Sequence, residues 1–212
     1  MPGQIKIDDG AGNYTVLTNG GSLGSDKTIT IPNTTGTMAL TSDISAGGLV
    51  HINTSTFSTA SSHSIDNCFS ATYTNYKIVI NLSAVTGSNI DFLVRLRVSS
   101  SDATTNYRTV RQFANGTSIT VDTDPTGTDD WTLGFITGTG TDVHSGTIDL
   151  FNPFSATTTN GLTSFNGEFG AAHYLIACDW ANTNATSYDG ITFFPASGTI
   201  SGTVSVYGYA TS

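Results

Sequence analysis

The stretch that decides the fold is Tyr76-Lys77-Ile78-Val79-Ile80-Asn81-Leu82. Large apolar side chains occupy every second position in it, and a period of two is that of a β-strand with one buried face. The residues predicted to face the core are Tyr76, Ile78, Ile80 and Leu82. Residues 198–209 alternate in the same way and place Val204 and Val206 on the predicted inner face. Both stretches indicate sheets with one face packed on a core.

The composition favours strands throughout the chain. Only 11% of the 212 residues are charged, against about 25% in a typical soluble protein, and Glu168 is the only glutamate. Helix surfaces are normally covered with Lys, Glu, Arg and Gln, so this deficit argues against a helical protein. Thr suits a half-exposed pleated surface, and Gly, Asn, Asp and Ser supply tight turns. The sequence therefore predicts an all-β protein with one ordinary domain and a small additional segment.

Strands and turns can be placed beyond residue 47. The predicted strands are residues 49–57, 64–69, 75–82, 90–99, 107–113, 118–121, 131–136, 146–151, 170–180, 190–194 and 198–209. The predicted turns are residues 86–89, Asn115-Gly116, residues 124–127, Asn160-Gly161 and Asn166-Gly167. Short strands at regular spacing, without a convincing amphipathic helix, predict a β-sandwich of jelly-roll type.

The first 47 residues differ from the rest. They contain short alternating pieces at residues 4–7, 14–17 and 28–31, separated by glycines and Pro32. Pieces with so few large apolar residues cannot offset chain entropy alone, so they need partners. We therefore expect an extended β stalk or attachment segment at 1–47, joined at Gly47-Gly48 to a β-sandwich knob at 48–212. The large aliphatic residues of these pieces include Ile5, Ile7, Ile29 and Ile31.

The charge of the chain limits its partners. A formal net charge of −9 argues against binding to phosphate backbones or anionic lipid, so neither nucleic acid nor a membrane surface is an expected partner. No apolar stretch approaches the roughly 20 residues that cross a bilayer, and the first residues do not read as a signal peptide. We expect synthesis in a cytoplasm and no membrane insertion.

Paired arginines and cysteines have plain structural interpretations. Arg95 and Arg97 lie two apart in an apolar strand and so face the same side, which favours a ladder face or subunit contact over a ligand site. Cys68 and Cys178 each have core-like neighbours, which favours buried free thiols. A disulfide between them stays open as the alternative.

Residues 26–44 read DKTITIPNTTGTMALTSDI and resemble a segment that recurs in phage tail fibres. The alternating Ile and Thr would place a narrow apolar row at a threefold axis, while Pro32 and Gly36 would end the strand and turn the chain. The resemblance therefore implies a homotrimer made in a bacterial host. The candidate trimer-axis or particle-anchoring residues are Ile5, Ile7, Ile29 and Ile31.

A second resemblance lies in the predicted knob. Residues 64–80 (SIDNCFSATYTNYKIVI), 93–99 (LVRLRVS) and 198–209 (GTISGTVSVYGY) resemble the C-terminal domain of virion structural proteins from phages of aquatic bacteria. Members of this family are labelled tail fibre, head fibre or virion structural protein, so the resemblance implies a component of the virion. The stalk here lacks the long repeats of an extended tail fibre, which favours a compact spike or cement knob on the capsid.

Signals of catalysis are weak. The histidines His51, His63, His144 and His173 have no metal-ligand spacing, and His173 in its apolar strand reads as a structural histidine. Polysaccharide cleavage requires paired carboxylates, but Glu168 stands alone and the aspartates gather in predicted turns. Residues 122–130 could hold calcium, although a solvated acidic turn is the favoured interpretation. We therefore expect no enzyme activity, no cofactor and no metal.

Two tryptophans offer a candidate glycan site. Trp131 follows Asp129, and Trp180 precedes Asn182, so each ring has a polar neighbour that could bind sugar hydroxyls. The favoured alternative is that both rings cap the ends of the core or a subunit interface, as buried aromatic rings commonly do.

These observations give a leading and a competing hypothesis. The leading one is a non-enzymatic bacteriophage structural protein, a homotrimeric fibre or spike in the virion. It would be a tail fibre for host attachment or a capsid spike, cement or decoration protein. Its partners would be copies of itself, other capsid or tail proteins, and host surface glycan. The competing hypothesis is a polysaccharide-degrading or lectin-like carbohydrate-binding protein.

Overall fold

The computed structural model describes residues 5–8, 11, 14–17, 48–116, 118–138, 143–169 and 172–210. The chain divides into two compact units, Met1–Ile44 and Ser45–Ser212. Strands and turns make up the described residues, which contain no helix, so the prediction of an all-β protein is confirmed. It follows that no described helix is long and apolar enough to cross a membrane.

The first unit contains one hairpin among its described residues. Strand β1 (Ile5–Asp8) pairs antiparallel with β2 (Tyr14–Leu17), close to two of the alternating pieces predicted there. Ile5 is in register with Leu17, and Ile7 with Thr15. Ile29 and Ile31, the rest of the 26–44 segment and the predicted strand at 28–31 lie outside the described residues. The anchoring role of all four isoleucines stays a prediction.

The second unit contains an eight-stranded antiparallel sheet, called the large sheet below. In spatial order its strands are β3 (Gly48–Ala60), β15 (Thr199–Ala210), β5 (Asn75–Thr86), β11 (His144–Phe151), β12 (Thr159–Phe169), β13 (Ala172–Asn182), β8 (Tyr107–Asn115) and β9 (Ser118–Thr128). Many neighbours are distant in sequence, as β3 and β15 are, so the sheet forms only when the whole unit folds.

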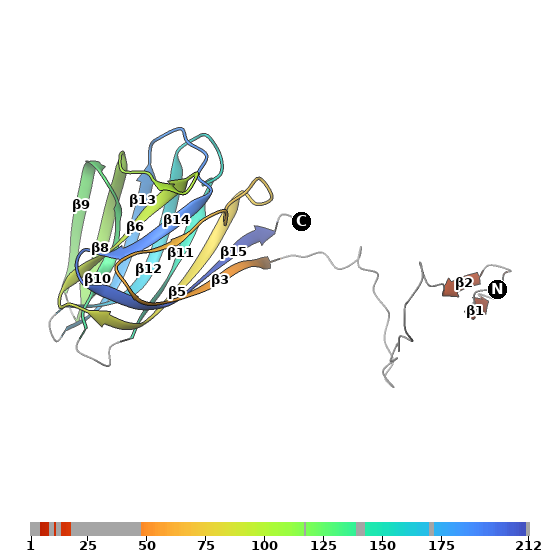
Figure 1. Ribbon diagram of the computed structural model, residues 1–212, viewed down its shortest axis with the longest axis horizontal. Helices are drawn as coiled ribbons and strands as arrows, with labels where there is room; N and C mark the ends of the chain where they lie inside the picture. The colour runs from red at the N-terminus through yellow and green to blue at the C-terminus, as the bar shows by residue number, and fades with distance from the viewer. Residues whose placement is uncertain are drawn as a thin grey trace. The chain divides into compact units, whose positions relative to one another are not determined.

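A smaller sheet lies across one face of the large sheet (Figure 1). Its strands, in spatial order, are β10 (Trp131–Ile136), β6 (Ile90–Val98), β14 (Gly190–Pro195) and β4 (His63–Ile65), with β7 (Ser101–Asp102) paired to β6. All of these pairs are antiparallel. Two sheets facing each other across a shared core form the arrangement of a β-sandwich.

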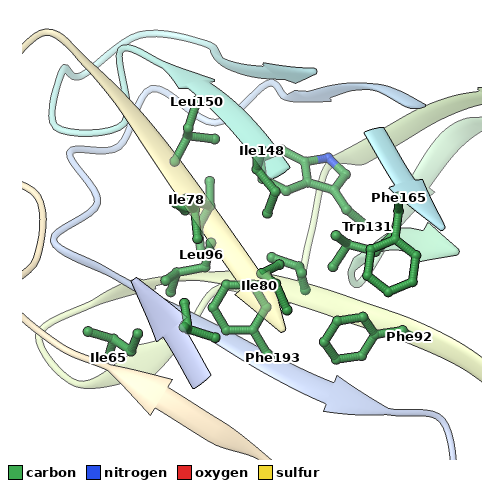
Figure 2. Close-up of a cluster of buried hydrophobic side chains, with 14 of the residues drawn as sticks. Ile65, Ile78, Ile80, Phe92, Leu96, Trp131, Ile148, Leu150, Phe165 and Phe193 are labelled. Atoms are coloured by element: carbon green, nitrogen blue, oxygen red, sulfur yellow. The ribbon is translucent and has the colours of Figure 1, made fainter. Parts of the chain in front are cut away.

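The core lies between the two sheets and confirms the predicted faces (Figure 2). No surface of Tyr76, Ile78, Ile80 or Leu82 is exposed, and the same holds for Val204 and Val206. Rings from both sheets meet there, as when Phe92 of β6 lies 5.7 Å from Phe165 of β12, centroid to centroid. Full burial of one such side chain contributes roughly 1.5–3 kcal/mol to the hydrophobic driving force.

Strand β12 corrects the sequence analysis, which placed turns at Asn160-Gly161 and Asn166-Gly167. Both dipeptides lie inside this strand, in the middle of the large sheet. A Cβ at Gly161 would lie 3.0 Å from Cε3 of Trp180, and a Cβ at Gly167 would lie 2.5 Å from Cδ1 of Ile176. These glycines therefore make room for large core side chains rather than turning the chain.

Other predicted boundaries are confirmed or corrected nearby. Asn115-Gly116 is a hairpin turn as predicted, with Gly116 at a φ of +57°. Residues 124–127 form no turn, because β9 continues through them and ends only at Thr128. The strand predicted at 64–69 ends at Ile65, since Asn67 adopts a φ of 56° and turns the chain. Cys68, beyond that turn, is nevertheless buried.

The first and last strands of the second unit bring its two chain ends side by side. The first residue of β3, Gly48, is in register with the last residue of β15, Ala210. The hairpin turn at Asn115-Gly116 lies at the opposite end of the large sheet. Strand β8 ends at this turn, whereas its first residue, Tyr107, pairs with Asn182 at the end of the sheet that holds Gly48 and Ala210.

Candidate functional site

The two tryptophans of the predicted glycan site form a pair in the core. Trp131 of β10 and Trp180 of β13 are 0% and 1% exposed, and their rings stack with centroids 5.1 Å apart. Nε1 of Trp131 donates a hydrogen bond of 3.0 Å to the carbonyl of Ala181. A ring that stacks on a sugar must present an open face, and neither ring does. The alternative interpretation, rings that close the core, therefore fits their positions.

Asn182 fixes two loops rather than facing solvent. Its side chain is buried, with Nδ2 donating to the carbonyl of Thr105 at 3.0 Å. Its Oδ1 accepts hydrogen bonds from the hydroxyl of Tyr188 at 2.9 Å and from the backbone N–H of Asn184 at 3.1 Å. All of its amide groups are thus used within the chain. The connection after β7 is thereby tied to the connection after β13.

Asp129 is the exposed member of the predicted glycan set. Its carboxylate lies 2.8 Å from Nη2 of Arg95, and its carbonyl accepts a second hydrogen bond of 2.9 Å from Nε of the same side chain. The structure therefore does not bring Trp131, Asp129, Trp180 and Asn182 to one exposed site. Two of them are core rings, one fixes loops, and one holds an arginine.

The outer face of the smaller sheet is covered by ion pairs within the chain. Nε of Arg97 lies 2.7 Å from Asp66, and its Nη1 contacts both Asp102 and, at 2.9 Å, the hydroxyl of Thr192. The guanidinium of Arg95 also lies 4.7 Å from the ring centroid of Phe194. Arg95 and Arg97 thus form the predicted ladder face, with partners supplied by neighbouring loops and strands.

The acidic stretch at 122–130 also meets arginine. Asp122 accepts hydrogen bonds of 2.9 and 2.6 Å from Arg111, which lowers the pKa of this carboxyl group. Arg111 in turn lies 3.5 Å from Asp91 of β6, so it links the two sheets. Within the described part of the chain, no group of three or more His, Cys, Asp or Glu side chains is placed to hold a metal ion.

Both cysteines are buried, and the histidines differ in their exposure. Cys68 and Cys178 are free and buried as favoured, and burial raises the pKa of each thiol to about 12. His144 is buried and stacks on Phe165. His173 lies exposed on β13, and its interpretation as a structural histidine stays a prediction.

The outer face of the large sheet carries an unusual set of exposed aliphatic side chains, called the aliphatic patch below. Its members, with their exposed fractions, are Val110 (47%), Ile119 (72%), Val121 (56%), Leu162 (51%) and Leu175 (60%). They come from the four adjacent strands β12, β13, β8 and β9. Soluble monomers rarely expose contiguous apolar patches, and large ones mark interaction sites.

Strand register brings these side chains onto one face. Val110 is opposite Asp179, and Asp179 is opposite Leu162, which makes one row across three strands. Ala114 lies between Ile119 and Leu175 in a second row. Val121 is two residues from Ile119 on β9 and diagonal to Val110 on β8, so these three side chains are within reach of one another. Asp179 separates Leu162 from Val110, and Ala114 separates Leu175 from Ile119.

Shallow hollows lie within the patch. One, of about 370 Å³, is lined in part by Arg108, Val110, Asn160 and Asp179. A second, of about 220 Å³, shares Val110 and Asp179 and extends over Leu162. The surface therefore has both protruding side chains and depressions, the relief that close packing against a partner needs.

Charges on this face are few and balanced. The described charged side chains are Lys77, Arg108, Asp149 and Asp179. Lys77 Nζ lies 2.9 Å from Asp149, whose carboxylate also accepts a hydrogen bond from Tyr209. Arg108 and Asp179 form no ion pair with any residue that the structure describes.

The aliphatic patch could not be predicted from the sequence, although part of its signal is present there. Val110 lies two residues after Arg108, so an aliphatic and a charged side chain share the outward face of one strand. Leu162 could not be placed because β12 was not recognised. Comparisons with known proteins add no further guide, since no family model, curated protein or solved structure matches the chain.

Proposed function

We propose that this chain is a non-enzymatic structural protein of a bacteriophage particle, a homotrimeric fibre or spike. Residues 1–47 attach it to the particle, and residues 48–212 form a knob of jelly-roll type. The observation that carries the proposal is the aliphatic patch, because an all-β unit that leaves such a surface open is built to associate. The resemblance of residues 26–44 to a tail-fibre segment supports the threefold arrangement.

The treatment of charged groups supports a structural role over an enzymatic one. Carboxylates near the smaller sheet are bound to arginine, as Asp66, Asp102 and Asp122 are. A general acid or base must instead be free to exchange a proton with substrate. A sugar-binding surface would expose aromatic rings, but Trp131 and Trp180 both lie in the core.

Two positions on the particle remain open within this proposal. A tail fibre binds a host receptor, and its loss abolishes adsorption. A capsid spike, cement or decoration protein covers many capsid sites, and its loss weakens the head. The number of copies per particle, measured by quantitative mass spectrometry of purified virions, separates the two. Absence of the protein from such virions contradicts both.

The first test is the molar mass of the purified full-length protein by light scattering, beside a variant that begins at Gly48. We expect three times the chain mass of 22.1 kDa for the full-length protein. A trimer in both proteins places the main contacts in residues 48–212. A full-length monomer that binds or cleaves polysaccharide contradicts the proposal and favours the competing carbohydrate hypothesis.

A further inference from the structure

The aliphatic patch has no cover among the described residues of the chain. Its five side chains are each about half exposed or more, on four strands that are otherwise well paired. We propose that this patch is the surface through which one copy of the chain binds the next in a closed ring of three. The inference rests on the homotrimer proposed above and assigns its contact.

The distribution of charge favours a second copy of the chain as the molecule that covers the aliphatic patch. The chain has a formal net charge of −9, so two copies repel each other over much of their surface. The outer face of the large sheet is an exception, because its described cations Lys77 and Arg108 balance its described anions Asp149 and Asp179. A basic partner would be drawn to the acidic surfaces instead. A second copy approaches this face with the least repulsion.

Arg108 and Asp179 provide the specific pairing. Both line the hollow of about 370 Å³, and neither forms an ion pair with a described residue. In a ring, Arg108 of one copy binds Asp179 of the next, so each copy uses both groups once. An aliphatic side chain of the neighbouring patch fills the hollow between them. Removal from water strengthens the Coulomb attraction between the two charges, since screening by solvent is weaker in a dry contact.

The contact uses the face of the sheet rather than its edge. Strand β9 ends the large sheet, and its outer edge pairs with no described strand. However, β9 contains Pro125, which has no N–H to donate, and the charged residue Asp122. Proline and charge on an edge strand prevent pairing with another chain. We therefore assign the contact to the outer face of the large sheet.

The experiment compares full-length variants by light scattering over a series of concentrations. Leu162→Asp and Val110→Asp each introduce an uncompensated charge into the patch, and we expect the dissociation constant of the trimer to rise about 100-fold. Leu49→Asp is the matched control, since Leu49 is 46% exposed on β3, at the other edge of the same sheet. It should leave the trimer intact. Circular dichroism and thermal unfolding verify that each variant folds.

Charge reversal tests the specific pair. Arg108→Asp and Asp179→Arg should each weaken the trimer about 10-fold, because each places like charges together. The double variant Arg108→Asp/Asp179→Arg should restore wild-type association. Such a rescue is not expected if either residue serves only the fold of its own chain.

The outcomes separate this inference from the proposed function. A trimer that persists in Leu162→Asp and Val110→Asp, with neutral charge reversals, overturns the assignment of the face and leaves the homotrimer standing. A trimer lost equally in Leu49→Asp also overturns the assignment. A wild-type protein that is monomeric at every concentration refutes the homotrimer itself.

Discussion

The outer faces of the two sheets differ in how they are completed. On the smaller sheet, Arg95 and Arg97 project outward and are bound by carboxylates of the same chain. On the large sheet, aliphatic side chains project outward, and Arg108 and Asp179 have no ion-pair partner among the described residues. On the first face, the chain's own carboxylates neutralise the two arginines. The second leaves its aliphatic side chains exposed.

The difference shows that the surroundings of a charged residue decide its role. Arg97 and Arg108 come from neighbouring stretches of sequence, yet the side chain of Arg97 is only 11% exposed and has several partners. Those partners come from the loop after β4 and from the short strand β7. No described loop folds over Arg108 in the same way. Arg108 therefore stays exposed.

The largest expected effect comes from removing the ring that joins the two sheets. Trp131→Ala should lower the free energy of unfolding by about 4 kcal/mol, because it leaves a cavity beside Trp180 and removes the hydrogen bond to Ala181. Urea denaturation followed by circular dichroism measures the loss. Trp131→Phe should cost less, since it keeps a ring. Unchanged stability together with a loss of sugar binding would restore the glycan interpretation.

A smaller effect is expected on the arginine-covered face. Arg97→Ala should lower the free energy of unfolding by about 2 kcal/mol, since it leaves the nearby carboxylates of Asp66 and Asp102 without their cation. The matched pair on the large sheet is Lys77–Asp149, where both side chains are a quarter or more exposed. Lys77→Ala should cost below about 1 kcal/mol. Equal losses in the two variants would contradict the contrast between the faces.

The smallest expected effect is a dependence on pH at the edge strand β4. Burial lowers the pKa of His63, whose ordinary value is 6.5. The unfolded chain therefore takes up a proton before the folded chain does as the pH falls. This contribution to stability is complete above about pH 6.5 and decreases below it. His63→Gln should flatten that part of the stability profile, measured by thermal unfolding between pH 7.5 and 5.5. A profile identical to wild type would show that other groups cause the decrease.

Alternation along a strand was enough to predict much of the fold. Tyr76, Ile78, Ile80 and Leu82 were assigned to the core from a period of two, and all are fully buried. The strand at 131–136 was placed at its observed bounds. Such patterns succeed because a strand between a core and solvent must alternate in polarity, whichever strands lie beside it.

Features that depend on a distant neighbour could not be predicted in this way. Gly161 reads as a turn residue until Trp180 is known to lie against it. Trp131 and Trp180 each stand beside polar residues, so the sequence left a sugar platform open beside the favoured core cap, and their stacking across the two sheets could not be predicted. Local composition describes a residue's neighbours along the chain, whereas burial depends on strands that pair over long separations.

The register of Gly48 with Ala210 makes the second unit a candidate for circular permutation. A short linker could join these residues directly, and the chain of the second unit could then be opened at the Asn115-Gly116 hairpin at the far end of the large sheet. Circular permutation is tolerated where termini lie close together and the new break falls in an exposed turn. The permuted knob would carry its free ends at the opposite pole, ready to receive a fused peptide.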